Sequence, residues 1–466
     1  MPLWTLDEIL AATSGTASSC VVEAFSGVSI DSRDIGPGDL FVAISGDRFD
    51  GHDFVAKAIE NGADAALVGA TWAKTAPDHL PLIIVDDPLV GLEQMAVAAR
   101  ARTSAKVVAV TGSVGKTSTK EAIRLVLEAA GQTHASIKSF NNHWGVPLML
   151  ARMPAETDFG VFEVGMNHAN EIRPLVKMIK PNIAVVTNVG EAHLENFESV
   201  SGIAAAKAEI FEGLTKNGTA ILCADHEYLG DLKSRALASG VSDVMTFGVS
   251  SDADVRVSEV RSQDQGLDCE LITGTKKIDL HVPQFGEHAL LNAAAAFSVA
   301  AKLGHDQERT IQALSAFVAP VGRGEIVRLA LRRGEATLLD ESYNANPVSM
   351  RAALRIMQSI ATSGKKIGVL GDMLELGGTS AQLHLDLAQS VLASGISQLY
   401  LVGPKMALLA EKLNGEIDVT HHETGARISD LLSEALAPND LVMVKGSNGI
   451  GLGLVVEQLR RQYSAD

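Results

Sequence analysis

One short stretch of the sequence combines the residue types that bind phosphate. The apolar, β-branched residues 107–110 run into Thr111-Gly112-Ser113-Val114-Gly115-Lys116-Thr117-Ser118, and a helical pattern follows at once. In a strand–loop–helix of this kind the glycines let backbone N–H groups close on an anion, and the helix N-terminus adds its dipole. Lys116 would reach the β- and γ-phosphates of a nucleotide, and the Thr117 hydroxyl would ligate Mg²⁺. We predict a nucleotide-phosphate site made of Gly112, Ser113, Val114, Gly115, Lys116, Thr117 and Ser118.

This loop departs from the general phosphate-loop pattern at one position. That pattern has a glycine six residues before the lysine, where this chain has Val110. The match is therefore to a shorter variant, Gly-x-x-Gly-Lys-Thr. The alternative is a strand, turn and helix that bind nothing, and the order of strand, loop, Lys-Thr and helix favours the phosphate site.

Two further side chains follow apolar strands and could hold a metal. Glu163 ends the expected strand 159–164, and a carboxylate at the end of a strand near a phosphate loop can hold Mg²⁺ directly or through water. The alternative is a capping or salt-bridged glutamate. His193 follows the expected strand 183–189, beside the nucleotide site, which favours a metal or substrate role over an ordinary loop histidine.

Lys207 occupies an unusual position in a helical pattern. It shares one stripe with Ile203, Ile210, Phe211 and Leu214. A lysine on such a stripe can extend its amine to solvent. The alternative is a desolvated amine with a lowered pKa, nucleophilic enough to capture CO₂ as a carbamate, which is a metal-binding anion. The sequence alone leaves both possibilities open.

Several polar clusters interrupt otherwise apolar segments. Each of them can be turn chemistry, because Asn, Gly, Asp and Pro build turns. The clusters are Asn141-Asn142-His143-Trp144-Gly145-Val146-Pro147, Gly286-Glu287-His288 with Asn292, Gly322-Arg323-Gly324-Glu325, Asp340-Glu341-Ser342-Tyr343-Asn344-Ala345-Asn346-Pro347, and Lys445-Gly446-Ser447-Asn448-Gly449.

The elements that position these residues indicate an α/β protein of about three domains, because 466 residues are too many for one core. We expect a small α/β domain over residues 1–103 and a phosphate-loop domain over 104–321, whose uniformly apolar strands are typical of a buried parallel sheet. The expected strands 367–370, 399–402 and 441–444 each run into a glycine and alternate with helices. This pattern predicts a Rossmann-like domain over residues 322–466.

The composition excludes several classes of protein. A formal net charge of −17 argues against a nucleic-acid partner, which requires a basic surface. Cys20, Cys223 and Cys269 are scattered, which suits core thiols in a reducing cytoplasm. The N-terminus lacks a basic segment followed by an apolar one, so we expect no signal peptide. The apolar window 289–301 is too short and too interrupted to span a membrane.

Taken in order, these motifs resemble the Mur ligase family, the ATP-dependent ligases that build the peptidoglycan stem peptide. The resemblance runs from about Ser29 to Gly449, nearly the whole chain. Within the family it favours the member that adds a dipeptide. The stretches that carry it are Asp31-Ser32-Arg33, Gly38-Asp39-Leu40-Phe41-Val42-Ala43, Asp50-Gly51-His52-Asp53-Phe54, Asn141-Asn142 to Pro147-Leu148, Tyr343-Asn344-Ala345-Asn346-Pro347 and Leu370-Gly371-Asp372-Met373-Leu374-Glu375-Leu376-Gly377.

The resemblance implies a reaction and a role for each candidate residue. ATP would phosphorylate the terminal carboxylate of UDP-N-acetylmuramoyl-tripeptide, and the amine of D-alanyl-D-alanine would attack the acyl phosphate. The chain would be a cytoplasmic monomer, and its C-terminal domain would have to close on the phosphate loop. The resemblance implies that the catalytic residues are Lys116, His193 and a carbamylated Lys207. Of two Mg²⁺ ions, the first would be held by Thr117 and Glu163 and the second by His193 and Lys207. Besides the phosphate loop, the residues implied to contact ATP are His288, Asn292, Arg323 and Asp340, and those implied to contact the other substrates are Ser32, Arg33, Asn141, Asn142, Asn344 and Asn346.

Two departures from the family pattern and several alternatives bear on the acceptor. The chain has Val348 where the family often has an acidic residue after Asn-Pro, and Asn448 where it often has an arginine after Lys-Gly-Ser. The alternatives are a sister ligase that adds one amino acid, a folylpolyglutamate synthase, a phosphate-loop regulatory switch and a catalytically silent scaffold. The third residue of the tripeptide, lysine or diaminopimelate, does not follow from the sequence.

Overall fold

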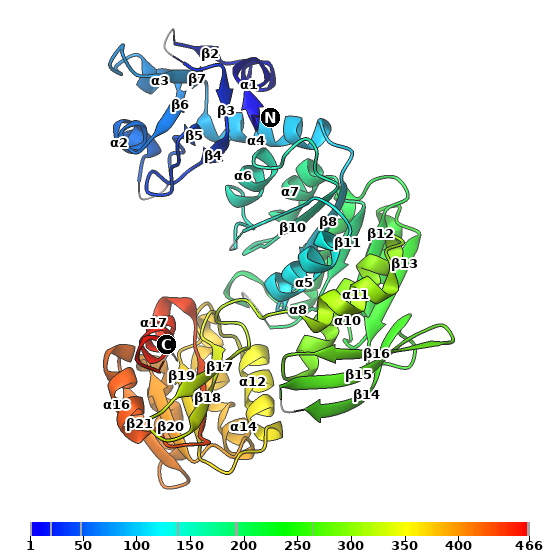
Figure 1. Cartoon of the computed structure of the whole chain (residues 1–466), viewed down its shortest axis with the longest axis vertical. Coiled ribbons are helices and arrows are strands. Elements are labelled where there is room, and N and C mark those ends of the chain that lie inside the picture. Colours follow the sequence, from blue (N-terminus) through cyan, green and yellow to red (C-terminus); the bar gives the residue numbers. More distant parts are fainter. Residues whose placement is uncertain are drawn as a thin grey trace.

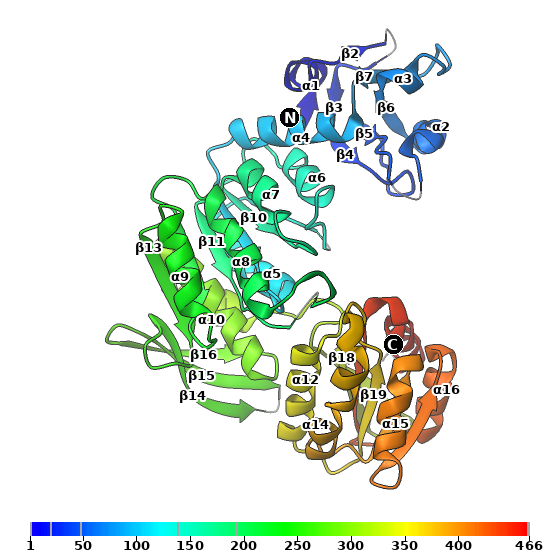
Figure 2. The ribbon, with the colours of Figure 1, turned by 180° about the vertical axis from the view of Figure 1, so that it is seen from behind.

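The computed structural model describes residues 2–18, 21–46, 49–137, 139–191, 194–263 and 265–463. Over these residues the chain forms N-terminal, central and C-terminal α/β domains that follow one another along an arc (Figure 1). The view from behind shows the N-terminal and C-terminal domains contacting opposite ends of the central one (Figure 2). The predicted three-domain α/β architecture is confirmed.

The N-terminal domain is a small, mostly parallel sheet with helices around it. Its strand order is β2-β7-β6-β5-β4, and a separate β1–β3 pair lies beside it. Helix α4 begins where the Asp87 side chain accepts hydrogen bonds from the N–H groups of Leu89 and Val90, with Pro88 in the first turn. The elements are β1 (Trp4–Thr5), α1 (Leu6–Thr13), β2 (Thr16–Ala17), β3 (Ala24–Phe25), β4 (Gly27–Ser29), β5 (Asp39–Val42), η1 (Gly51–Phe54), α2 (Val55–Glu60), β6 (Ala63–Gly69), α3 (Ala70–Ala73), β7 (Leu82–Val85) and α4 (Pro88–Ala101).

The central domain is built on a sheet in the order β16-β15-β14-β13-β12-β11-β8-β10-β9, parallel from β9 to β14 and antiparallel beyond. Helices α5, α10 and α11 cover one face, and α7, α8 and α9 cover the other (Figures 1 and 2). Its strands are β8 (Lys106–Thr111), β9 (Thr133–Ala135), β10 (Phe159–Glu163), β11 (Ile183–Val186), β12 (Thr219–Cys223), β13 (Asp243–Gly248), β14 (Val255–Gln263), β15 (Gly266–Thr273) and β16 (Lys276–Val282). Its helices are α5 (Lys116–Glu128), α6 (Gly145–Ala151), α7 (Ile172–Ile179), η2 (Leu194–Asn196), α8 (Val200–Ala208), η3 (Glu209–Gly213), α9 (Leu229–Ala238), α10 (Glu287–Lys302) and α11 (Gln307–Ser315).

The C-terminal domain is a doubly covered sheet in the order β17-β18-β22-β19-β20-β21, parallel except for β17. Apolar side chains of α12 to α15 cover one face, and those of α16 and α17 cover the other. The strands are β17 (Glu325–Ala330), β18 (Glu335–Glu341), β19 (Lys366–Gly371), β20 (Gln398–Val402), β21 (Asp418–His422) and β22 (Leu441–Lys445). The helices are α12 (Pro347–Ser359), η4 (Gly377–Thr379), α13 (Ser380–Leu385), α14 (Ala388–Ala393), η5 (Pro404–Met406), α15 (Ala407–Leu413), η6 (Gly425–Arg427), α16 (Ile428–Ala435), η7 (Asn448–Ile450) and α17 (Leu452–Tyr463).

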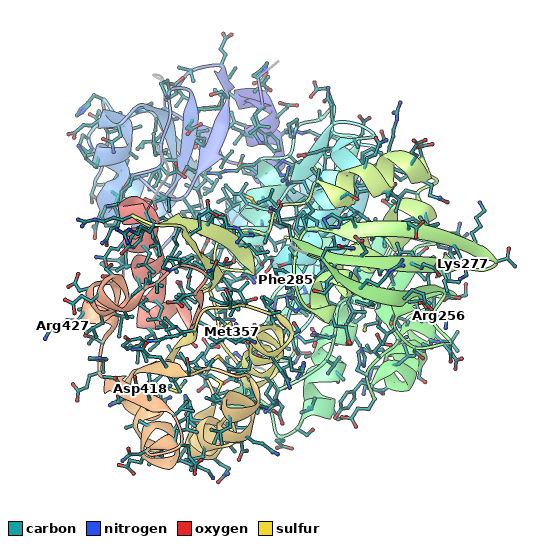
Figure 3. All side chains as sticks on the ribbon, turned by 60° about the horizontal axis from the view of Figure 1, so that its bottom comes forward. Arg256, Lys277, Phe285, Met357, Asp418 and Arg427 are labelled. Carbon is teal, nitrogen blue, oxygen red and sulfur yellow. The ribbon has the colours of Figure 1, made fainter. Side chains whose placement is uncertain are left out.

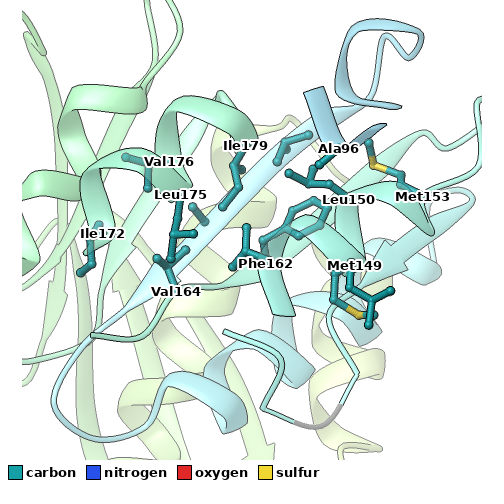
Figure 4. Close-up of a cluster of buried hydrophobic side chains, with 14 of the residues drawn as sticks. Ala96, Met149, Leu150, Met153, Phe162, Val164, Ile172, Leu175, Val176 and Ile179 are labelled. Carbon is teal, nitrogen blue, oxygen red and sulfur yellow. The ribbon is translucent and has the colours of Figure 1, made fainter. Parts of the chain in front are cut away.

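The N-terminal and central domains share one hydrophobic core. Ala96 of α4 packs among Leu150 and Phe162 of the central domain (Figure 4). The Trp4 Nε1–H donates to the Ala151 carbonyl at 2.7 Å, and Arg100 donates to the Ile179 carbonyl at 2.7 Å. Burial of a continuous apolar surface makes these two domains one packed unit.

The C-terminal domain contacts the central domain through a smaller apolar cluster. Phe285, just before α10, belongs to the same buried cluster as Ile356 and Met357 of α12. Phe285 and Met357 lie near each other where the two domains meet (Figure 3). The chain crosses between these domains in residues 316–324, after α11 and before β17. The start of α10, which includes His288, is therefore placed at the domain boundary.

Two expectations about elements need correction. The stripe through Lys207 was expected on one continuous helix, but α8 ends at Ala208, a 3₁₀ helix covers Glu209–Gly213, and Leu214 lies beyond it. The strand expected over residues 183–189 ends at Val186. In both cases the apolar pattern continues past the end of the element, because the following residues are buried in a different conformation. Among the described residues, no helix combines the length and apolar character needed to cross a membrane.

Removing the Trp4 hydrogen bond should destabilise the joined N-terminal and central domains. Trp4→Phe keeps an aromatic ring in the core but leaves the buried Ala151 carbonyl without its indole donor. We expect the unfolding free energy to fall by about 1–3 kcal/mol, measured by urea denaturation of the full chain. Trp72→Phe, in a ring that packs on His52 within the N-terminal domain, is the control and should cost less. An unchanged midpoint for Trp4→Phe would contradict this assignment.

Candidate active site

The phosphate loop connects β8 to α5, and its two glycines have positive φ. Gly112 has φ +153° and Gly115 has φ +84°. A Cβ at Gly112 would lie 1.8 Å from Thr187 Oγ1, and one at Gly115 would lie 2.9 Å from Asn292 Oδ1. Both positions therefore require glycine, for backbone conformation and for space. The Lys116 Nζ folds back and donates to the Gly112 carbonyl at 2.9 Å.

Asn188, which follows β11, accepts hydrogen bonds that hold the first half of this loop in place. The Val114 N–H donates to Asn188 Oδ1 at 2.9 Å, and the Ser113 N–H donates to the Asn188 carbonyl at 3.1 Å. In this conformation these two N–H groups are used within the protein. The first turn of α5, which begins at Lys116, is where a helix presents N–H groups without intrahelical partners. Of the predicted loop residues, Lys116, Thr117 and Ser118 are thus the ones whose backbone is best placed for an anion.

Glu163 lies at the carboxyl end of β10, next to β8, and is 1% exposed. Thr117 Oγ1 donates to its Oε2 at 2.7 Å, and Asn141 Nδ2 donates to its Oε1 at 2.7 Å. The structure therefore brings together three of the residues predicted from separate motifs. A carboxylate beside a hydroxyl is a donor set that suits Mg²⁺, which prefers oxygen ligands.

The rest of a Mg²⁺ shell would have to come from phosphate oxygens and water. Among the described residues, no cluster of three or more His, Cys, Asp and Glu side chains could hold a metal by itself. Mg²⁺ is often held in this way, by one or two protein ligands and its nucleotide. His193, the predicted ligand of a second ion, lies outside the described residues.

Lys207 is buried in the last turn of α8, with 2% of its surface exposed. The alternative in which its amine reaches solvent is therefore wrong. Burial lowers the pKa of Lys207 well below its usual value, and the charge of Lys116 lowers it further. The pKa of Lys116 is also lowered, by burial first, while Glu163 raises it and Arg323 lowers it. A lowered pKa increases the neutral fraction of the Lys207 amine, the form that can react with CO₂.

Helix α10 brings Asn292 against the phosphate loop. Asn292 is buried, and its Oδ1 accepts a hydrogen bond from Thr119 Oγ1 at 2.9 Å. His288 is half-buried one turn earlier, and burial lowers its pKa. The charges that act on the His288 ring include Glu341 and Lys445 of the C-terminal domain. The two predicted adenine contacts therefore lie on one helix, between the loop and the domain boundary.

Arg323 comes from the C-terminal domain and stacks on Tyr343, with its Cζ 4.1 Å from the ring centroid. Its charge lowers the pKa of Lys116. Asp340 is fully buried, and its oxygens accept hydrogen bonds from the Gly322 N–H at 3.1 Å and from the Ser342 hydroxyl at 2.6 Å. A ribose contact by Asp340 would require these bonds to be exchanged.

Several predicted substrate contacts have local structural roles. Asn142 Oδ1 accepts from the Gly145 N–H at 2.9 Å at the start of α6. Asn346 caps α12 through the Ser349 N–H at 2.9 Å, and Asn344 Oδ1 accepts from the Ala345 N–H at 2.9 Å. The amide nitrogens of Asn344 and Asn346 are the parts left for an acceptor. The side-chain oxygens of these three residues therefore form turns and a helix cap, the alternative stated for the polar clusters.

The predicted UDP-sugar residues lie far along the chain from the phosphate loop, in the N-terminal domain. Arg33 is 87% exposed and forms a two-point ion pair with Asp31, at 2.9 and 2.7 Å. The Ser32 carbonyl accepts from Asn61 Nδ2 at 2.7 Å. The structure places Ser32 and Arg33 in the N-terminal domain, and their contact with a UDP-sugar stays a prediction.

Two interactions near the site were not identified from the sequence. Lys445 is 2% exposed, lies opposite Glu341 on the neighbouring strand, and donates to Glu341 Oε2 at 3.3 Å and to the Asn344 carbonyl at 2.9 Å. Tyr343 OH and Ser139 Oγ lie 2.6 Å apart across the domain boundary. The ends of adjacent parallel strands could have indicated the first interaction, whereas no local pattern indicates the second.

Before any comparison, the geometry is typical of one class of protein, the phosphate-loop, nucleotide-dependent enzymes: a loop ending in lysine and threonine, with a buried carboxylate beside it, at the boundary with a second domain. Family models match nearly the whole chain, as "Mur ligase family, catalytic domain" over residues 24–99, "Mur ligase middle domain" over 110–300 and "Mur ligase, glutamate ligase domain" over 322–448. The chain belongs to the Mur ligase family of ATP-dependent ligases. The family and enzyme class predicted from the motifs are confirmed.

Named relatives agree with this assignment. UDP-N-acetylmuramoyl-tripeptide–D-alanyl-D-alanine ligase of Rickettsia prowazekii is 34% identical over 92% of this chain and 94% of its own. The crystal structure of MurF from Acinetobacter baumannii has a TM-score of 0.85 and 28% identity, covering 98% and 99% of the two chains. MurF ligase from Thermotoga maritima in complex with ADP has a TM-score of 0.80 and 25% identity, covering 94% and 97%.

The buried amine of Lys207 should be essential to activity as a carbamate rather than as a cation. We expect Lys207→Ala to abolish ligation while the chain stays folded, and short-chain carboxylates to restore part of the activity by supplying the missing anion. Activity and circular dichroism of the purified variant measure the two effects. Lys177→Ala, on the exposed side of α7, is the control and should be fully active. Wild-type activity in Lys207→Ala would remove the carbamate assignment.

Proposed function

We propose that this chain joins D-alanyl-D-alanine to UDP-N-acetylmuramoyl-tripeptide with cleavage of ATP to ADP and phosphate, the last cytoplasmic step of peptidoglycan precursor synthesis. The observation that carries the proposal is the buried Glu163 carboxylate beside Thr117 of the phosphate loop. The C-terminal domain reaches the same region, because Arg323 lies over the Tyr343 ring and the Tyr343 hydroxyl meets Ser139 of the central domain. Transfer of a phosphoryl group to an anionic carboxylate needs positive charge around both anions, which two domains can supply together. The proposal is supported by relatives named for this reaction over nearly the full chain.

The reaction begins with attack of the tripeptide's terminal carboxylate on the γ-phosphorus of ATP. A P–O bond forms to the carboxylate oxygen, the bond to ADP breaks, and an acyl phosphate results. The two reactants are both anionic, so the protein must screen their repulsion and align them. Lys116 neutralises charge on the transferring phosphoryl group, and Arg323 contacts the phosphates from the other side. Both side chains are partly buried, where water screens a charge less than it does at the open surface.

The amine of D-alanyl-D-alanine then attacks the acyl carbon. The resulting tetrahedral species loses phosphate with the C–O electron pair, and the amine loses a proton to give the amide. Asn344 and Asn346, at the start of α12, offer amide donors toward the incoming dipeptide. Domain contact excludes water from the acyl phosphate, which would otherwise hydrolyse it.

Mg²⁺ bound at this site would polarise the phosphate oxygens and offset their charge. Thr117 and Glu163 would hold one ion, with Asn141 orienting the Glu163 carboxylate. A carbamate on Lys207, together with His193, would hold a second. His288 and Asn292 would contact adenine and Asp340 the ribose, while Ser32 and Arg33 would lie in the domain that receives the UDP-sugar and Asn142 would shape the turn beside it.

The cellular setting follows from the same proposal. We infer a cytoplasmic reaction, because the proposed substrates are a nucleotide-linked precursor and a free dipeptide. Cys223 and Cys269 are free and buried, and burial raises their thiol pKa values to about 12 and about 11, which suits inert core residues in a reducing compartment. We infer that the chain acts as a monomer, because its three domains can supply every residue of the proposed site.

Phosphate release tests the reaction and its acceptor together. We expect release from ATP and Mg²⁺ with UDP-N-acetylmuramoyl-tripeptide only when D-alanyl-D-alanine is added, with a UDP-pentapeptide product by mass spectrometry. Release supported by a single amino acid would instead assign a sister ligase. Release that ignores both the tripeptide and the dipeptide would favour a nucleotide-hydrolysing switch.

A further inference from the structure

A hydrogen bond between Ser139 and Tyr343 crosses from the central to the C-terminal domain. Ser139 lies in the segment between β9 and α6, and Tyr343 follows β18. Their hydroxyl oxygens are 2.6 Å apart, and either can donate. Neither side chain was assigned a role by the reaction proposed above.

The central-domain end of this hydrogen bond is held on both sides. Before it, the Ser136 carbonyl accepts from the buried Lys120 Nζ at 2.5 Å, and the Ser136 N–H donates to the Val161 carbonyl at 3.0 Å. After it, the Asn141 carbonyl accepts from the Gly165 N–H at 2.8 Å. These anchors tie Ser139 to the phosphate-loop helix and to the strand that ends at Glu163.

The C-terminal end is tied to the cation of the site. The Tyr343 N–H donates to the Gly322 carbonyl at 3.1 Å, and the guanidinium of Arg323 lies over the Tyr343 ring at 4.1 Å. Gly322 has φ +76°, and a Cβ there would lie 2.8 Å from Tyr343 Cβ, so a glycine permits this close approach. The ring therefore fixes where Arg323 can point, through a cation–π contact.

We propose that the Ser139–Tyr343 hydrogen bond is a latch that seats the C-terminal domain and thereby positions Arg323 at the nucleotide phosphates. Tyr343 is a positioning residue, because it acts through Arg323. The kinetic part of this inference rests on the proposed function, whereas the closing of the two domains does not.

Two variants remove the hydrogen bond from opposite ends. Tyr343→Phe keeps the ring beneath Arg323 and loses only the hydroxyl, and Ser139→Ala removes the other hydroxyl. We expect each to lower kcat by about three- to tenfold, the loss of one hydrogen bond made in the closed state. The double variant should be no slower than either single one, because the two residues act as a unit. KM for UDP-N-acetylmuramoyl-tripeptide should not change, and Ser139→Thr, which keeps a hydroxyl, should retain activity.

Tyr400→Phe is the matched control. Tyr400 is a buried tyrosine of the same domain, and its hydroxyl accepts from Gln398 Nε2 at 2.9 Å within β20. The variant loses a hydrogen-bonded hydroxyl away from the domain boundary and should keep wild-type kcat. Losses within twofold of wild type for Tyr343→Phe and Ser139→Ala, or losses that multiply in the double variant, would overturn the latch.

Small-angle X-ray scattering separates the latch from the reaction. With Mg²⁺ and a non-hydrolysable ATP analogue, we expect wild type to have a smaller radius of gyration than Tyr343→Phe. If wild type showed no dipeptide-dependent ligation, the proposed function would fail, and this scattering difference would still decide the latch. Equal radii for the two proteins would overturn it even if ligation were confirmed.

Discussion

The buried carboxylate of Glu163 is the constraint on which the rest of the site depends. A buried charge is costly unless hydrogen bonds satisfy it, and here Thr117 and Asn141 do so from different parts of the chain. The bond to Thr117 fixes the first turn of α5, and the bond to Asn141 fixes the segment that leads back to Ser139. Through Ser139 and Tyr343, the same arrangement reaches Arg323 in another domain. The buried Glu163 carboxylate thus connects the phosphate loop, the proposed metal ligands and the domain boundary.

The charges around Glu163 suit a reaction between two anions. After burial, the charge of Lys116 lowers the pKa of Lys207, and the charge of Arg323 lowers the pKa of Lys116. This gathering of partly or fully buried cations is unfavourable without a bound anion. It becomes favourable when phosphate and carboxylate groups enter, because the repulsion among the cations is then replaced by attraction. A carbamate on Lys207 would remove one of these cations and turn it into a ligand.

The sequence was sufficient to predict those site residues whose function depends on a local pattern. The glycines at 112 and 115, the lysine–threonine pair and the carboxylate ending β10 follow from strand–loop–helix chemistry, and the structure places them together. The sequence was not sufficient to predict features that depend on contacts between distant segments. The helix carrying Lys207 ends at Ala208, because the buried residues after it continue as a 3₁₀ helix. Asn142, Asn346 and Asp340 belong to motifs, yet their oxygens serve turns and caps, which a motif alone does not distinguish from substrate contacts. Ser139 and Tyr343 are 204 positions apart and carry no shared pattern.

The central claim is that the tripeptide carboxylate itself attacks the γ-phosphate. Oxygen transfer tests it most directly. UDP-N-acetylmuramoyl-tripeptide labelled with ¹⁸O at both oxygens of its terminal carboxylate would be incubated with ATP, Mg²⁺, D-alanyl-D-alanine and the full chain, and the released phosphate examined by mass spectrometry. An acyl phosphate predicts that each phosphate carries one ¹⁸O atom, while the other stays in the new amide. Unlabelled phosphate formed alongside product would contradict the account, because the carboxylate would not have been phosphorylated.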